Sequence, residues 1–238
     1  MFMIPSVTSP LNDQQVGPPS VPSGIFARLL IFCVGAMCLL GLMMVFLLQK
    51  PDFYRERVSE KSGFTDEQSR RFLTKVAGLR AAVERTGTWE AVILDDEANA
   101  WLAIDLEKNH RLLLPKGLSR PRVKFEKRHI ALGCTVGAGP FSSVVSMNVR
   151  VELIQVDQMR IQVESARIGA FPMPRGAASK WIEESLTKVG MVCEARNMDG
   201  TIVLFVRLPS GRTGKDLVIH VESLHIDTGE ILFEGNTT

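Results

Sequence analysis

The feature that most constrains this chain is a run without a charged side chain, which extends from Leu29 to Leu48. Twenty residues in an α-helix rise about 30 Å, which matches the hydrocarbon core of a bilayer. Arg28 and Lys50 bracket the run, and their long side chains can reach the two membrane interfaces. A buried helix of a soluble protein rarely runs this far without a polar residue, so we expect a membrane span.

The run does not resemble a cleaved signal, which follows basic residues and ends at small residues. No basic residue precedes Arg28, and the run leaves through Gln, Lys and Pro at 49–51. We therefore expect a retained single-pass transmembrane helix over 25–49. The residues before it, 1–24, are rich in Pro and Ser, and we expect them to form a disordered tail.

The overall composition excludes some classes of protein. The 238 residues carry a formal net charge of only +2, which argues against nucleic acid as a partner. Four cysteines are too few for a disulfide-framed scaffold. Cys134 and Cys193 leave two alternatives open, a disulfide in an oxidising compartment or two buried free thiols.

A juxtamembrane amphipathic helix is expected within residues 50–87. Thr65 and Gln68 have the spacing of a capping box, and Gly87 ends the pattern. Apolar residues then recur at helical spacing, and we expect this stripe to pack on the chain's own domain. The stripe consists of Phe72, Val76, Leu79 and Val83.

Residues 88–238 show the patterns of an α+β domain. A strand-like segment, 89–94, precedes a short acidic helix start, and a second helix is expected from Pro174 to Gly190. From residue 122 onward apolar residues alternate with polar ones, which is typical of antiparallel strands with one buried face. We expect a curved, mainly antiparallel sheet packed on one or two helices, with a tight hairpin at Asp157-Gln158.

No residue pattern indicates an active site or a metal site. His220 and His225 are five apart in an expected strand, so they face opposite sides of the sheet. The acidic run 95–97 fits the first turn of a helix better than a metal site or a general acid. Ser185-Leu186-Thr187-Lys188 and the Gly-rich segment 211–216 match only fragments of the S-x-x-K and phosphate-loop motifs. We therefore expect no catalytic residue, no metal and no cofactor, and hence no enzyme.

Two short motifs carry a family resemblance. The first, E-x-N-x-x-L, opens the acidic helix, and the second, G-x-F-P-x-P, opens the later helix. Their order, behind a membrane span, resembles the YpmS-like family of bacterial membrane-anchored proteins, and is more loosely similar to tubular lipid-binding (BPI-like) folds. The motif residues are Glu97, Asn99, Leu102, Gly169, Phe171, Pro172 and Pro174.

The resemblance and the charge pattern disagree about orientation. The family's domain usually lies outside the cytoplasm and has no accepted catalytic residues. Basic residues flanking the span instead place the domain in the cytoplasm, if they are counted alone. One basic residue, Arg28, precedes the span, whereas four follow it: Lys50, Arg55, Arg57 and Lys61. We follow the resemblance and expect an extracytoplasmic domain.

These observations predict a membrane-anchored envelope protein, held in the bilayer by residues 29–48, whose domain binds or transfers a lipid or another apolar ligand. The alternative is a non-catalytic scaffold subunit that acts through protein contacts, at an exposed sheet edge or the Pro-rich tail. The sequence does not identify a protein partner. For the first function, the resemblance implies an apolar groove, whose expected residues are Val145, Met147, Val149, Val151, Met159, Ile161, Trp181 and Phe205.

Overall fold

The fold is described here from a computed structural model of the chain. It describes residues 23–59, 65–110, 114, 117–137, 139, 142–208 and 217–238. Most of the expected tail and the whole segment 211–216 lie outside these residues. The chain divides into two compact units, residues 1–42 and residues 43–238.

Helix α1 (Ser23–Leu48) contains the apolar run. Its large apolar side chains are mostly exposed, with Phe32 at 75% and Met37 at 71%. Among the described side chains, no single helix is both long and apolar enough to cross a bilayer. The segments Phe32–Leu48 and Asp52–Val58 are bent by 62° from one another. Taken together, this pair meets the requirements for a membrane span, by length and composition alone. The membrane span therefore stays a prediction.

The range 50–87 holds two helices, α2 (Asp52–Ser59) and α3 (Asp66–Val83). The predicted capping box starts α3: the hydroxyl of Thr65 accepts from the Gln68 amide, and the Thr65 amide donates to Gln68 Oε1. Of the predicted stripe, Phe72 packs against the domain core, whereas Val76 is 42% exposed.

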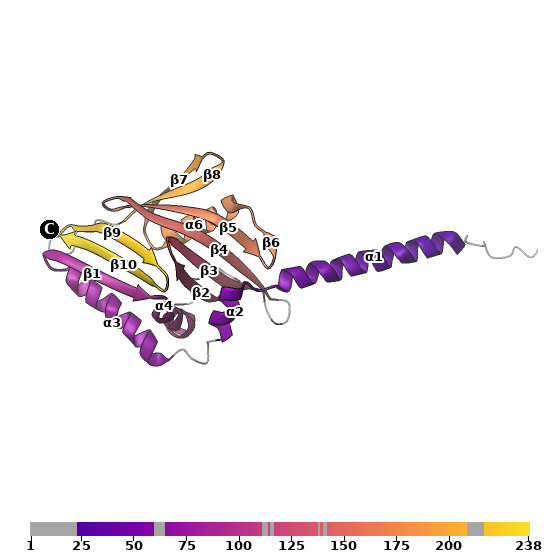
Figure 1. Cartoon of the computed structure of the whole chain (residues 1–238), viewed down its shortest axis with the longest axis horizontal. Coiled ribbons are helices and arrows are strands. Elements are labelled where there is room, and N and C mark those ends of the chain that lie inside the picture. Colours follow the sequence, from indigo (N-terminus) through magenta and orange to yellow (C-terminus); the bar gives the residue numbers. More distant parts are fainter. Residues whose placement is uncertain are drawn as a thin grey trace, which may run out of the picture. The chain divides into compact units, whose positions relative to one another are not determined.

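Residues 43–238 form an α+β unit with two antiparallel sheets (Figure 1). The smaller sheet, in the order β1-β10-β9, consists of β1 (Gly87–Leu94), β10 (Glu230–Thr237) and β9 (Ile219–Asp227). The larger sheet has the order β2-β3-β4-β5-β8-β7, with β6 pairing to β5. Its strands are β2 (Leu118–Glu126), β3 (His129–Val136), β4 (Ser143–Gln155), β5 (Gln158–Ile168), β6 (Phe171–Pro172), β7 (Val192–Met198) and β8 (Thr201–Arg207).

The segments with alternating apolar residues form strands of the larger sheet, because successive side chains of a strand point to opposite faces. The predicted hairpin joins β4 to β5, and its turn includes Asp157 at a φ of +61°. A short helical segment lies between β1 and β2: α4 (Asp95–Trp101), the π-helical turn η2 (Leu102–Leu106) and α5 (Glu107–Asn109). The last helix is α6 (Arg175–Lys188).

The core has two parts, which meet on the same face of the larger sheet, because Phe125 lies opposite Ile130, which in turn lies opposite Val149. One part joins the smaller sheet, α3 and α4 to β2, around Ala98, Phe125 and Ile226. The other part packs α6 against β4, β5 and β8, around Ile161 and Leu204. The expected helix-covered sheet is therefore present, and α6 is the helix that covers its apolar face.

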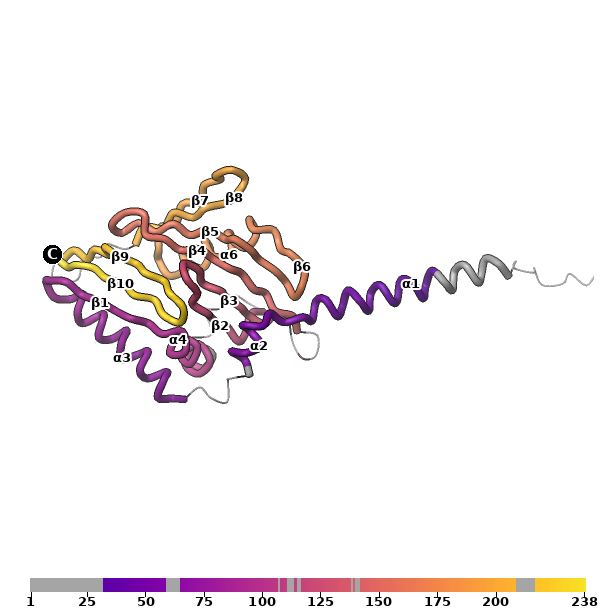
Figure 2. Tube along the Cα trace, in the orientation of Figure 1, coloured from indigo at the N-terminus to yellow at the C-terminus, as the bar shows by residue number. Residues whose placement is uncertain are grey.

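The two sheets are tied together at their turns, where the chain brings distant segments side by side (Figure 2). The amide of Asp157, in the β4–β5 turn, donates to the carbonyl of Val221 in β9 over 3.1 Å. The Gly229 amide donates to the Phe125 carbonyl over 3.1 Å. These bonds join the β4–β5 turn to β9, and the β9–β10 turn to β2.

The structure decides between the two alternatives for the cysteines. Cys134 lies in β3 and Cys193 in β7, and strands β4, β5 and β8 separate them in the sheet. Neighbouring strands are about 4.8 Å apart, whereas the Cα atoms of a disulfide lie within about 7 Å. A disulfide between them is incompatible with this fold, and both thiols are free.

Candidate functional site

Helix α6 lies beside an apolar cavity of the larger sheet. Pro174 precedes the helix and Gly190, at a φ of +81°, follows it. Ala178 is fully buried on its inner face, where Ile182 also packs against the sheet. Trp181 lies to one side of this face and remains 37% exposed. The helix therefore covers the sheet incompletely.

The space left between α6 and the sheet is a groove of about 450 Å³. We call this space the α6 groove. Ligand pockets of proteins span about 300–1,000 Å³ and are mostly apolar, so its size and lining match such a site. The lining consists of Leu102, Leu118, Pro121, Arg122, Val123, Leu132, Gly133, Cys134, Met147, Trp181, Ile182, Ser185, Leu186 and Val189.

The polar groups of the lining are engaged by the protein itself. Ser185 Oγ donates to the carbonyl of Trp181 over 2.8 Å. The Arg122 guanidinium donates to the carbonyls of Pro121 and Arg57. Burial raises the pKa of the Cys134 thiol to about 11, so this thiol is neutral at physiological pH. What the α6 groove offers a ligand is therefore mainly apolar contact.

The structure brings only part of the predicted groove together. Of the eight predicted residues, Met147 and Trp181 line the α6 groove. Phe205 alternates with Leu204 and Val206, which pack towards α6, so it lies on the opposite face, beneath the Arg196 guanidinium. The other five are buried or half-buried strand positions outside the lining: Val145, Val149, Val151, Met159 and Ile161.

The pattern of the sequence did not reveal the remaining lining residues. Leu118 and Pro121 lie in β2 before residue 122, where the predicted alternation begins, and Leu132 lies in β3, which the alternation identified only as a strand. Ile182 and Leu186 belong to the predicted apolar stripe of the second helix, but a stripe does not tell which residues are left uncovered. That information depends on how α6 crosses the sheet.

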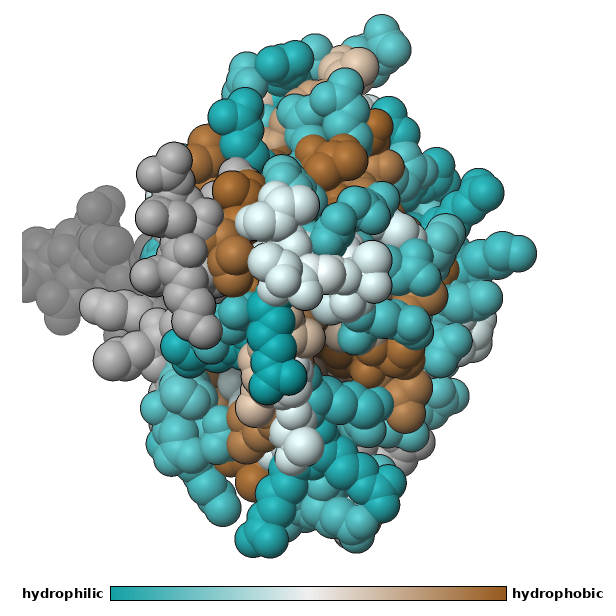
Figure 3. Space-filling model, turned by 90° about the vertical axis from the view of Figure 1, so that its left-hand side faces the viewer, coloured by the Kyte–Doolittle hydropathy of each residue, from teal (hydrophilic) through white to brown (hydrophobic). Residues whose placement is uncertain are grey.

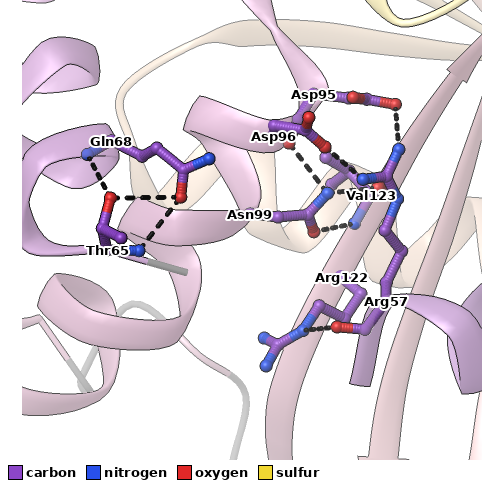
Figure 4. A network of polar contacts seen from close by, with 8 residues as sticks. All are labelled: Arg57, Thr65, Gln68, Asp95, Asp96, Asn99, Arg122 and Val123. Carbon is purple, nitrogen blue, oxygen red and sulfur yellow. Dashed lines mark hydrogen bonds and ion pairs between the residues drawn. The ribbon is translucent and has the colours of Figure 1, made fainter. Parts of the chain in front are cut away.

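Charge pairs hold the acidic start of α4, which runs from Asp95 to Glu97 of the first motif (Figure 4). Arg57 of α2 pairs with Asp95 over 2.8 Å and also with Asp96. Burial raises the pKa of Asp95, and the positive charge of Arg57 partly opposes that shift. Glu97 is buried and accepts from the Lys75 ammonium of α3 over 2.6 Å. The acidic run thus joins α4 to both preceding helices, which agrees with the interpretation as a helix start.

Asn99 of the same motif ties α4 to β2. Its side chain is fully buried, and its Nδ2 donates to the carbonyls of Asp95 and Val123 over 2.8 and 2.7 Å. Its Oδ1 accepts from the Val123 amide over 2.9 Å. Asn99 therefore acts as a strand partner for β2 (Figure 4), while Leu102, three residues on, lines the α6 groove.

The second motif holds the last turn of α1. The Ala170 amide donates to the Phe46 carbonyl over 2.9 Å, and the Phe171 ring meets the Phe46 ring edge-on at 6.2 Å. Gly169 has a φ of +60°, and a Cβ there would stand 2.3 Å from the Leu47 carbonyl oxygen. Pro172 lies in β6, and Pro174 starts α6. The motif therefore joins the end of α1 to the start of α6.

Other chemistry has less support in the described part of the chain. Within that part, no group of three or more His, Cys, Asp or Glu side chains is arranged to hold a metal ion. On the side of the molecule shown in Figure 3, which lies at the left of Figure 1, hydrophobic residues form separate patches between hydrophilic ones. The α6 groove is therefore our candidate site.

Comparison of the chain with protein-family models, with curated proteins and with solved structures finds no match. The assignment of a function therefore depends on the geometry of the chain itself.

Proposed function

We propose that this protein is anchored in the membrane by a single pass of α1 and that its α6 groove binds a lipid or another apolar ligand. The observation that carries the proposal is the groove itself, a space of about 450 Å³ lined almost wholly by apolar side chains. Trp181 and Val189 stand at its edge with 37% and 57% of their surface exposed. Contiguous apolar surface that is left uncovered is a feature of ligand-binding grooves.

The membrane anchor gives the ligand its source. The apolar side chains of α1 between Phe32 and Phe46 are largely exposed, which is costly in water and favourable in lipid. A domain tethered beside a bilayer meets acyl chains at high local concentration. We place the domain outside the cytoplasm, as the YpmS-like resemblance implies. A phosphatase fused after Thr238 is expected to be active; an inactive fusion that is well expressed would contradict this placement.

Binding without catalysis fits the contacts of the acidic residues. Asp95, Asp96 and Glu97 each pair with a base from a neighbouring helix, and the Cys134 thiol in the groove is held neutral. These groups stabilise the fold and are not placed to act on a bound molecule. The proposal therefore assigns the protein a binding or transfer role.

The experiment compares two exposed valines. Val189 lines the α6 groove, whereas Val192 begins β7, outside the lining, and is 68% exposed. We expect the full chain to bind a fluorescent fatty acid, Val189→Arg to weaken that binding at least tenfold, and Val192→Arg to leave it unchanged. A charge at the groove edge must lose water when the acyl chain enters, which is the cause of the loss. Equal binding by both variants would refute the groove as the site.

A scaffold role is the second candidate, and the edge of the larger sheet favours it. Among the strands that the structure describes, β7 pairs on one side only, with β8, and its side chains are mostly exposed, including Val192 and Met198. An open edge can accept a strand from a partner. If this were the function, Val192→Arg would disrupt a complex of the full chain isolated from membranes, and Val189→Arg would not. The same pair of variants thus separates the two functions.

A further inference from the structure

A second cavity lies beside the end of α1, on the face of the larger sheet opposite to α6. Its volume is about 370 Å³. Residues 49–53 form one wall, β4 and β5 form the floor, and Gly169-Ala170 closes a third side. Met147 of β4 packs towards α6, so its neighbours Ser146 and Asn148 point to the other face, into this cavity.

The floor of the cavity consists of two polar cross-strand pairs. Ser146 lies directly opposite Arg167, and Asn148 lies directly opposite Ser165 in the β4–β5 register. Opposed residues of antiparallel strands point to the same face with their Cβ atoms about 5 Å apart. Hydroxyl, amide and guanidinium groups are therefore gathered on one small surface, which offers several hydrogen-bond donors to a single ligand.

The charge of the cavity is positive. Lys50 in the wall and Arg167 in the floor are exposed, and neither has an ion-pair partner among the described residues. The carboxylate in the lining, Asp52, pairs with Arg55 over 2.8 Å. Two cations beside hydroxyl donors are the arrangement that proteins use for phosphate groups.

The position of the cavity relates it to the membrane. Residues 49–53 directly follow the apolar run, so they lie at headgroup depth if α1 spans the bilayer. The wall is also fixed, because the Phe46 carbonyl accepts from the Ala170 amide and the Leu47 carbonyl accepts from the Ser143 hydroxyl. The cavity is thus preformed around the end of α1, and does not depend on mobile surface side chains alone.

We propose that this cavity binds the phosphate of an anionic phospholipid, with Lys50 and Arg167 as its cationic ligands and Ser146 and Ser165 as hydroxyl donors. The inference rests on the anchoring half of the proposed function and not on the α6 groove. It gives the juxtamembrane segment a lipid-binding role that is separate from the binding of an apolar ligand.

The test measures lipid binding to the full chain in detergent micelles by native mass spectrometry. The probes are phosphatidylglycerol, diacylglycerol, which lacks the phosphate, and glycerol 3-phosphate, which lacks the acyl chains. The variant K50Q/R167Q removes both cations from the cavity. The control K180Q/R207Q removes two exposed cations from α6 and β8, outside the lining, so that both variants carry the same net charge.

We expect the chain to prefer phosphatidylglycerol over diacylglycerol, and K50Q/R167Q to lose about 25-fold in affinity, at roughly fivefold per basic residue near a membrane surface. K180Q/R207Q should bind like the unaltered chain. An equal loss in both variants would reduce the effect to net charge and overturn the site. Glycerol 3-phosphate binding as tightly as the lipid would overturn the lipid assignment in favour of a soluble phosphate compound.

The two proposals fail in different ways. Fatty-acid binding to the α6 groove should be the same in K50Q/R167Q as in the unaltered chain, and Val189→Arg should leave phosphatidylglycerol binding unchanged. Because Lys50 and Arg167 are exposed and form no ion pair within the described structure, circular dichroism and thermal unfolding should show K50Q/R167Q to be folded normally. Loss of phosphatidylglycerol preference in Val189→Arg alone would assign that lipid to the groove instead.

Discussion

The start of α4 and the α6 groove lie in the same domain, but they differ in how fully their side chains are paired or covered by the protein. Around α4, buried polar groups meet partners: Asp95 meets Arg57, Glu97 meets Lys75, and Asn99 completes the edge of β2. Beside α6, apolar side chains such as Trp181 and Val189 are left without full cover. The difference indicates which region is built for stability and which is available to a ligand. Substitutions in the two regions should therefore have different consequences.

The largest effect is expected at Asn99. Replacing it with Leu keeps the volume similar but removes three hydrogen bonds from a fully buried position. The Val123 amide and two carbonyls then lose these hydrogen bonds, and we expect the free energy of unfolding to fall by about 4 kcal/mol. Urea denaturation followed by tryptophan fluorescence measures this change. The control Asn197→Ala, on exposed β7, should change the free energy of unfolding by less than about 0.5 kcal/mol. Similar changes in the two variants would contradict the role of Asn99 in holding α4 to β2.

Arg57→Met is expected to cost about 3 kcal/mol near neutral pH, because it leaves the Asp95 carboxylate buried without its cation. Burial already raises the pKa of Asp95, and loss of Arg57 raises it further. Raising the folded-state pKa favours the protonated form, so the cost should shrink as the pH falls towards about 4–5 and grow as it rises.

Denaturation at several pH values measures this dependence. Arg55→Met breaks an exposed pair with Asp52 and serves as the control, with a change within about 0.5 kcal/mol at every pH. A cost for Arg57→Met that does not vary with pH would show that Asp95 is not the group left uncompensated.

Gly169→Ala tests the joint between the second motif and α1. The new Cβ would stand 2.3 Å from the Leu47 carbonyl oxygen, at a φ of +60°, so we expect about 2–3 kcal/mol of destabilisation. Gly190→Ala has a φ of +81° but no atom within 4 Å, and should cost only about 1 kcal/mol. Thermal unfolding of both variants gives the difference, which reports on the docking of α1. Equal costs would mean that this close approach contributes nothing to stability.

The smallest effect on stability is expected at the groove edge. Val189→Arg places a charge on a side chain that is already 57% exposed, so the free energy of unfolding should change by less than about 0.5 kcal/mol. Its loss of fatty-acid binding should nevertheless be large. A clear loss of stability in urea denaturation would instead make Val189 part of the fold's core and weaken its assignment to a ligand site.

Local patterns predicted much of the fold. The capping box at Thr65, the strands with a period of two and the β4–β5 hairpin follow from residue spacing alone, because each depends on neighbours in the sequence. The division of the larger sheet from the smaller one did not follow, since the pairing of β1 with β10 joins residues more than a hundred positions apart. The open choice between a disulfide and free thiols had the same cause, because the number of strands between two cysteines is a property of sheet order.

The candidate site was predictable only in outline. Alternation identified Met147 as facing the apolar side, and helical spacing did the same for Trp181. Alternation also selected Phe205, because both faces of β8 are apolar and the sequence does not say which face meets α6. Core residues such as Val149 and Ile161 have the same pattern as groove residues, and only the crossing of α6 over the sheet separates them.

The most direct test of the central claim is photo-cross-linking of the full chain, in membranes, with a fatty acid that carries a diazirine on its acyl chain. Digestion and mass spectrometry then locate the labelled residues. We predict labels on α6 at Ile182 and Leu186 and on β4 at Met147, in addition to those on α1 from the surrounding bilayer. Labels confined to residues 29–48 would contradict the α6 groove as a ligand site.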